Sequence, residues 1–117
     1  MGNPLKKISL STRNFIHLIK VENILYCQSN NSYTTFFFND NKETITVSVS
    51  IKKIEEQLCN NNFIRPHQSY LVNTLYIKSL SKISDGELLL ANGTYIPVSS
   101  RKKKAILHFL KQSSQIQ

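Results

Sequence analysis

The amino-acid sequence predicts a mainly β domain that contains two short helices. Three observations lead to this fold class. β-Branched and aromatic residues recur with a period near two over residues 6–49 and again over residues 75–98. Turn-forming Asn, Asp and Gly residues separate these runs. The period becomes helical in two places, over residues 50–59 and 100–110, and 117 residues are enough to bury one modest core.

Five short strands are expected before the first helix, because their apolar residues alternate with polar ones. These strands are Lys6–Thr12, Phe15–Lys20, Ile24–Gln28, Tyr33–Phe38 and Glu43–Val49. Residues 13–14, 29–32 and 39–41 carry the polar side chains that are typical of turns. In the fifth strand one face is apolar and the other polar, so the first is expected in the core and the second in water. The apolar face consists of Ile45, Val47 and Val49.

The first helix is expected from Ser50 to Cys59, where apolar residues recur at helical spacing and Ser50 can cap the N-terminus. The apolar residues are Ile51, Ile54 and Leu58. Residues 60–62, all Asn, end this helix. The next segment, residues 63–67, is not expected as a central strand, because Pro66 lacks the N–H group that a central strand donates.

A three-stranded meander and a second helix complete the predicted elements. The strands are Leu75–Ile83, Glu87–Ala91 and Thr94–Val98. Asp85-Gly86 and Asn92-Gly93, which lie between them, favour two-residue hairpin turns. Ser99 or Ser100 caps the final helix, which extends to about Leu110. Its apolar face consists of Ile106, Phe109 and Leu110.

The charge of the chain points to a polyanionic partner. Fifteen Lys and Arg residues against seven Asp and Glu give a net charge of +8, which favours nucleic acid or an anionic membrane surface. No run approaches the roughly eighteen apolar residues of a membrane span, and the N-terminus lacks a signal-peptide core. The two cysteines, Cys27 and Cys59, are too few for a secreted disulfide scaffold. We therefore expect a soluble cytoplasmic protein with no membrane partner.

The sequence offers no catalytic centre. Motifs of the nucleophile elbow, the phosphate loop, the dinucleotide fold and the zinc proteases are absent, and S-x-x-K at residues 50–53 lacks its companion motifs. Glu55 and Glu56 are adjacent and point about 100° apart on a helix. Cys59 and His67 could be drawn as a thiolate pair, but a thiol beside an apolar stripe is typically a small core residue. The His and Cys residues lack metal-ligand spacing, so we expect no enzyme, metal or other cofactor.

Two segments are candidates for a basic binding surface. Residues 101–104, Arg-Lys-Lys-Lys, lie in the first turn of the last helix, where free N–H groups can hold phosphate. Lys52 and Lys53 repeat this arrangement at the first helix. The alternative in both places is a solvated basic face. The hairpin tip at residues 30–33 adds polar side chains and one aromatic ring, Tyr33, although ordinary turn chemistry explains it equally well.

A further candidate segment, residues 65–69, concentrates hydrogen-bonding groups in a stretch that Pro66 keeps extended. Gln68 is of a type that pairs with adenine, and Arg65 of a type that pairs with guanine or phosphate. His67 could belong to this loop or could turn inward as a hydrogen-bonded structural residue. Gln68, of opposite parity, would then face outward.

The chain resembles the LytTR DNA-binding domain of bacterial response regulators in one string, Phe63-Ile64-Arg65-x-His67-x-Ser69-Tyr70-x-Val72-Asn73. Other landmarks follow in the same order: residues 24–26 before a polar tip, the helix at 50–59, and residues 92–99 before a basic helix. The resemblance runs from about residue 8 to residue 110. It departs from the family at Gln68, where Arg or Lys is frequent, and at Pro66, where a small or β-branched residue is usual.

This resemblance implies an elongated, mainly β domain of about ten short antiparallel strands in small sheets with two short α-helices. It implies sequence-specific binding to double-stranded DNA, with loops that enter successive major grooves and bend the duplex. The DNA-binding residues that it assigns are Tyr33, Gln68 and Arg101, together with Asn31, Lys102, Arg65 and Ser69. The domain is expected over residues 8–112, after a linker remnant or cloning artefact at 1–7 and before a C-terminal tail at 113–117.

The resemblance also implies partners. The chain is expected to be the output domain of a two-component transcription regulator, controlled by a receiver domain on the parent chain or a sensor kinase upstream, although a free-standing domain is an alternative. It is expected to be a monomer in isolation and to pair on repeated half-sites of DNA.

Two other function classes are open on the sequence alone. An RNA-binding β domain would use Tyr33 and the rings of Phe36, Phe37 and Phe38 as a stacking platform, which requires these rings to be exposed. A protein-interaction or ligand-sensing module would have no affinity for DNA.

Overall fold

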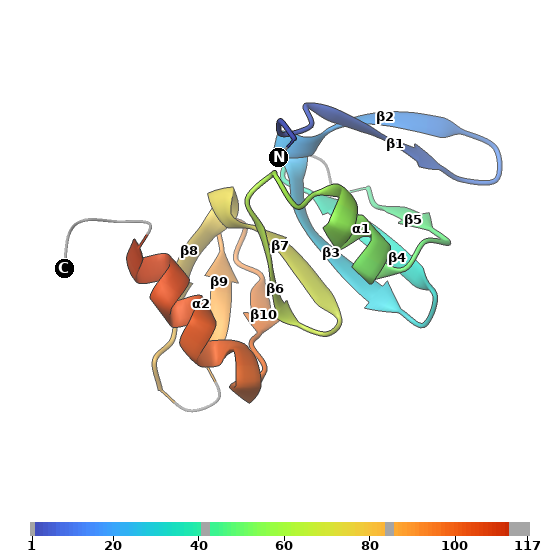
Figure 1. Ribbon diagram of the computed structural model, residues 1–117. Coiled ribbons are helices and arrows are strands. Elements are labelled where there is room, and N and C mark those ends of the chain that lie inside the picture. Colours follow the sequence, from blue (N-terminus) through green and yellow to red (C-terminus); the bar gives the residue numbers. More distant parts are fainter. Residues whose placement is uncertain (1, 41–42, 84–85, 113–117) are drawn as a thin grey trace.

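Ten short strands in three antiparallel sheets and two α-helices make up the part of the chain that the structure describes, residues 2–40, 43–83 and 86–112 (Figure 1). The structure is a computed structural model. The predicted C-terminal tail, residues 113–117, lies outside the described residues, as do Met1 and the turn residues Asn41 and Asp85. The predicted mainly β fold class with two helices is confirmed.

The sheets have two, five and three strands. The strands are β1 (Lys7–Ser11), β2 (Ile16–Lys20), β3 (Ile24–Asn30), β4 (Tyr33–Phe38), β5 (Ile45–Val47), β6 (Phe63–His67), β7 (Tyr70–Asn73), β8 (Ile77–Leu80), β9 (Glu87–Leu90) and β10 (Tyr95–Pro97). The helices are α1 (Ile51–Gln57) and α2 (Ser100–Gln112). β1 pairs with β2, the five-stranded sheet has the order β5-β4-β3-β7-β6, and the third sheet has the order β10-β9-β8. The molecule is elongated, with extents of 47 × 29 × 26 Å.

Both faces of the five-stranded sheet are buried, so the domain has two cores. On one face, α1 and the β1–β2 hairpin cover the sheet and contribute Ile54 and Leu10 to the first core (Figure 1). On the other face, the three-stranded sheet and α2 form the second core, which contains Ile106. Successive residues of a strand point to opposite faces, so β7 places Leu71 in the first core and Val72 in the second.

The first helix is confirmed together with its cap. α1 begins after Ser50, whose Oγ accepts a hydrogen bond from the N–H of Lys53 at 3.3 Å. The three apolar residues predicted to face the core are all buried. The helix ends at Gln57, short of the predicted Cys59, and the chain turns through Asn62 at a φ of 60°. Asn tolerates this left-handed conformation better than most residues, which lets the chain turn into β6.

Pro66 lies in β6, which is the outermost strand of its sheet, as its missing N–H group requires. The pairing of β6 with β7 shifts register between Ile64 and His67, so the ladder is interrupted at Arg65 and Pro66. The prediction that this segment is not a central strand is confirmed. Pairing resumes at His67 and Tyr70, on either side of the β6–β7 turn.

The strand predictions need two corrections around Asn73. Periodicity alone did not identify β7, which pairs with both β3 and β6. The predicted strand Leu75–Ile83 begins only at Ile77, because residues 74–76 form a 3₁₀ turn. The side chain of Asn73 holds this turn: its Oδ1 accepts from the N–H of Leu75 at 3.0 Å, and its Nδ2 donates to the carbonyl of Ile24 at 2.9 Å. A bond between distant parts of the chain leaves no trace in the periodicity.

The first and fifth strands are shorter than predicted. β5 keeps the expected alternation, because Val47 is buried and Thr46 is exposed.

Before β1, the main chain of Leu5 makes two hydrogen bonds to the side chain of Asn61. The N–H of Leu5 donates to Oδ1 at 3.1 Å, and its carbonyl accepts from Nδ2 at 2.7 Å. Leu5 is therefore held against the turn that follows α1.

Candidate nucleic-acid interface

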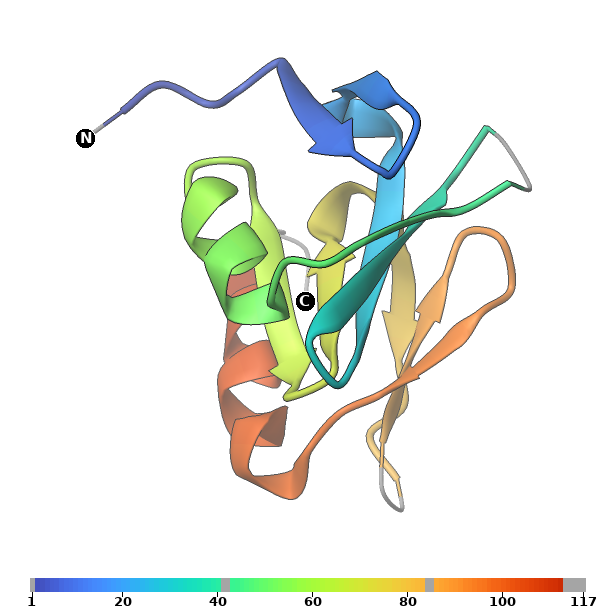
Figure 2. The ribbon, with the colours of Figure 1, turned by 90° about the vertical axis from the view of Figure 1, so that its right-hand side faces the viewer.

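Three segments that are distant in sequence form one edge of the molecule, which we call the loop edge: residues 30–33, 67–69 and 99–102. The β3–β4 turn, the β6–β7 turn and the start of α2 all lie on the lower side of the molecule in Figures 1 and 2. Main-chain hydrogen bonds join them. The N–H of Ser29 donates to the carbonyl of Ser69 at 2.8 Å, and the N–H of Ser99 donates to the carbonyl of Pro66 at 2.9 Å.

The β3–β4 turn presents Tyr33 at one end of the loop edge. The turn consists of two residues and not the predicted four, since β3 extends through Asn30 and pairs it with Tyr33. Asn31 has a φ of 59°, the left-handed conformation that such hairpin turns require. The side chain of Tyr33 is 53% exposed, and Asn31 is exposed beside it. The turn therefore offers one aromatic hydroxyl and one amide to a partner.

The β6–β7 turn is held by side chains from within the protein. Nη1 of Arg65 lies 2.6 Å from Oε1 of Glu55, and Nη2 donates to the main-chain carbonyl of Gln68 at 2.6 Å. Nδ1 of His67 accepts from the N–H of Ser69 at 3.0 Å, and its ring lies edge-on to Tyr70. His67 is therefore the hydrogen-bonded structural residue that the sequence allowed as one alternative. The side chain of Gln68 is exposed, as the parity of the strand predicts.

The start of α2 supplies the positive charge of the loop edge. Arg101 is exposed, Lys102 is half-buried, and the first turn contains no acidic residue. Cations in this position oppose the positive end of the helix dipole, and a bound anion reverses the sign of that interaction. A groove of about 460 Å³ separates this helix start from the β6–β7 turn. Gln68, Arg101 and Lys102 all line it.

The structure divides the seven residues assigned to DNA into groups. Gln68, Arg101 and Lys102 share the groove, with Ser69 in the adjoining turn. Tyr33 and Asn31 lie on the neighbouring turn of the same edge. Arg65 lines the groove as well, but its guanidinium bonds within the protein and its side chain is only 16% exposed.

Glu55 is the site residue that the sequence did not reveal. It lies on α1, one turn of helix after the cap, and its carboxylate meets Arg65 from another element. The sequence pattern places Glu55 on the polar face of the predicted helix, as an ordinary surface charge. The local spacing contains no signal that pairs it with Arg65.

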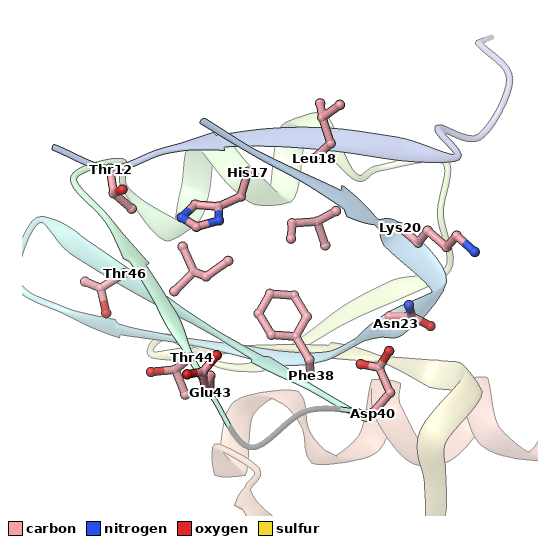
Figure 3. A pocket seen from close by; sticks show the side chains of 12 residues that line it. Thr12, His17, Leu18, Lys20, Asn23, Phe38, Asp40, Glu43, Thr44 and Thr46 are labelled. Atoms are coloured by element: carbon pink, nitrogen blue, oxygen red, sulfur yellow. The ribbon is translucent and has the colours of Figure 1, made fainter. Parts of the chain in front are cut away.

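A larger recess, of about 970 Å³, lies away from the loop edge between the β1–β2 hairpin and strands β4 and β5. Figure 3 shows His17 and Phe38 pointing into it from opposite walls, with Asp40 at one end. A single imidazole faces carboxylates across this recess, without a serine or cysteine beside it among the lining residues.

The described residues hold no group of three or more His, Cys, Asp or Glu side chains that could bind a metal ion.

Burial raises the pKa of the Cys27 thiol well above its usual value, so this residue stays a protonated core side chain. Across the described ranges, no helix combines the length and the apolar character needed to cross a membrane.

The RNA-binding alternative requires exposed Phe rings, and the structure contradicts this requirement. Phe36 is fully buried in the first core. Phe37 stacks on Tyr26, with ring centroids 4.3 Å apart and planes 8° apart, and Phe38 packs against the first core. These rings fill the two faces of the sheet, so they do not form a platform for bases.

Comparison with known proteins identifies a family. A family model described as the LytTr DNA-binding domain matches residues 14–111. The chain is 32% identical over 107 residues to the sensory transduction protein LytT of Bacillus subtilis (strain 168), which covers 87% of this chain and 44% of that protein. It is 31% identical over 104 residues to an uncharacterized response regulatory protein of Yersinia pestis, which covers 87% of this chain and 42% of that protein. The chain thus spans less than half the length of these two relatives.

Two further similarities are more limited. The transcriptional regulatory protein LytR of Staphylococcus aureus (strain N315) is 33% identical over 67 residues, which cover 57% of this chain and 26% of that protein. A solved structure, described as the LytTr DNA-binding domain of a response regulator from Bacillus cereus, superposes with a TM-score of 0.77. The superposition covers 92% of this chain and 98% of the Bacillus cereus chain. The sequence identity is 23%, so this similarity shows the fold.

Proposed function

The chain belongs to the LytTR DNA-binding domain family, and from this premise we propose that it binds double-stranded DNA sequence-specifically as the output domain of a bacterial transcription regulator. The observation that carries the proposal is the loop edge, where the β3–β4 turn, the β6–β7 turn and the start of α2 lie on one side of the molecule (Figure 1). Tyr33 adjoins the first turn, and Gln68 and Arg101 line the groove between the other two. A partner that follows this edge meets exposed amide, phenol and guanidinium groups in turn. These groups suit base edges and phosphates in DNA grooves.

We assign the contacts by exposure. Gln68 and Arg101 flank one groove and read bases there, while Tyr33 contacts a more distant part of the duplex. Lys102, Ser69 and Asn31 lie beside them and contact phosphates. Because the edge joins separate turns, the domain enters successive major grooves and bends the duplex to reach both. Arg65 supports the β6–β7 turn from the protein side, and binding involves no catalytic step.

The partners beyond DNA follow from the relatives. The response regulatory protein of Yersinia pestis is more than twice as long as the matched segment, so we propose that this domain, residues 8–112, acts under a receiver domain or an upstream sensor kinase. Two domains occupy repeated half-sites when the regulator pairs on DNA, and the isolated domain is a monomer.

Selection of bound duplexes from a random pool tests the proposed function. The domain is expected to enrich one short motif, and a repeated half-site is expected when a paired regulator is used. If the domain retains duplexes without enriching any motif, it binds DNA through its positive charge alone and without sequence specificity. A domain that retains none would contradict DNA binding altogether.

Binding is expected to weaken steeply with salt, because Lys and Arg side chains displace counterions from phosphates. At about −0.9 per phosphate that a Lys or Arg side chain neutralises, the slope of log affinity against log salt should be roughly −4 to −6, which requires other basic side chains besides Lys102 to contact phosphates. Fluorescence anisotropy at several KCl concentrations measures this slope. A slope near zero would remove the electrostatic part of the proposal.

A further inference from the structure

We propose that Glu55 is a positioning residue for the β6–β7 turn, acting through Arg65 on the main-chain carbonyl of Gln68. This inference rests on the proposed function, since it concerns how the turn is held for reading DNA. Glu55 itself contacts no base in this arrangement. Its effect on DNA is indirect and passes through two hydrogen bonds.

The geometry links three elements in a row. The guanidinium of Arg65 donates to Oε1 of Glu55 and to the carbonyl of Gln68, each at 2.6 Å. A guanidinium is planar and rigid, so fixing one of its nitrogen atoms also fixes the direction in which the other donates. The carboxylate on α1 therefore determines where Arg65 holds the turn.

Main-chain contacts hold the turn at His67, which pairs with Tyr70, and at Ser69, which accepts from Ser29, but the ladder is interrupted just before it. The pairing of β6 with β7 is irregular between Ile64 and His67, next to Pro66, which cannot donate a main-chain hydrogen bond. The bond from Arg65 to Gln68 spans this irregular stretch and closes it. Beyond it, the N–H of Ser69 bonds to His67, so both residues of the turn are tied.

The carboxylate is itself firmly placed. α1 packs on the first core through Ile51 and Ile54, and Leu58, which directly follows the helix, is buried in the same core. Glu55 is on the same helix, and its side chain is 42% exposed, while that of Arg65 is 16% exposed. A short helix bound to the core thus provides a fixed support for a turn on the surface.

The negative charge of Glu55 opposes DNA binding, so its effect on affinity can be measured apart from its effect on specificity. Glu55 lines the same groove as Arg101 and Lys102, and its carboxylate repels phosphate there. Removing this charge favours every duplex, whereas releasing Arg65 loosens the turn that discriminates between duplexes. The two effects are opposite in sign, so affinity and specificity should change in different directions.

The test compares Glu55→Ala with Glu56→Ala, which removes the same charge from an exposed neighbouring position. Dissociation constants are measured for the selected duplex and for a scrambled one at the same salt concentration. Glu55→Ala is expected to lower the ratio of the two affinities about five- to tenfold, with scrambled-duplex affinity unchanged or higher. Glu56→Ala is expected to keep the ratio of the wild-type domain. Thermal unfolding of both variants checks that they remain folded.

A second measurement needs no DNA. Backbone ¹⁵N relaxation of the free domain reports the order of the amides of Gln68 and Ser69, which should fall in Glu55→Ala and not in Glu56→Ala. Unchanged amide order in Glu55→Ala would overturn the positioning role. Lower order with an unchanged affinity ratio would overturn its part in reading DNA. If the wild-type domain does not discriminate between duplexes, the proposed function fails, and amide order still decides the role of Glu55.

Discussion

Arg101→Ala is expected to weaken binding to the preferred duplex by about 1 to 3 kcal/mol and to relax base choice at one position of the site. Arg101 is exposed in the first turn of α2 and lines the groove opposite Gln68. Its guanidinium can donate two parallel hydrogen bonds to O6 and N7 of guanine, which no other base accepts in the same way. Titration against the selected duplex and its single-base variants measures both effects.

Two further variants define what Arg101 does. Arg101→Lys keeps the charge and loses the planar, rigid pair of donors, so it should restore phosphate attraction fully and base choice only in part. Lys111→Ala removes one charge from the opposite end of the same helix and is expected to leave base choice unchanged. Equal losses of Arg101→Ala for every sequence would show that Arg101 holds a phosphate and reads no base.

Phe36→Ala is expected to lower the free energy of unfolding by about 3 to 5 kcal/mol. Phe36 is fully buried in the middle of β4, where it pairs with Cys27 and Ile45 of the adjacent strands. Its removal leaves a cavity in the first core that neighbouring side chains fill only in part. Since small domains have about 5 to 15 kcal/mol of total stability, the variant should lose a large share of it. Urea unfolding followed by circular dichroism measures the change.

Phe15→Ala is the matched control, because the ring of Phe15 is 66% exposed. It is expected to change stability by no more than about 0.5 kcal/mol. A loss of similar small size in Phe36→Ala would mean that the Phe36 ring is not part of the core. That result would remove one of the three buried rings on which the rejection of the RNA-binding platform rests.

Local chemistry explains why several elements are predictable from sequence. The limits of β4 match the predicted Tyr33–Phe38, because polar turn residues flank an unbroken aromatic and β-branched run. Ser50 marks the start of α1, because its hydroxyl accepts from an N–H group three residues ahead. Pro66 places its segment at an edge, since a missing N–H group is a property of the residue and not of its surroundings.

The candidate site was only partly predictable, because local chemistry reveals residue types but not the contacts between distant elements. The residues assigned to DNA could be named from their chemistry and from the family resemblance, and four of the seven line one groove: Arg65, Gln68, Arg101 and Lys102. The support beneath them could not be named. The partners of Arg65 are a carboxylate from α1 and a carbonyl within its own turn, and its role depends on both.

The sequence by itself determined the fold class, the two helices, the position of Pro66 at an edge, and the basic and amide groups available to a partner. Each of these follows from the properties of one residue or one short run. Only the tertiary structure decided that Glu55 contacts Arg65, that Asn73 bonds to Ile24, and that two turns and the start of α2 share one edge. Such contacts depend on how distant strands pair, and strand pairing is set by packing across the whole domain.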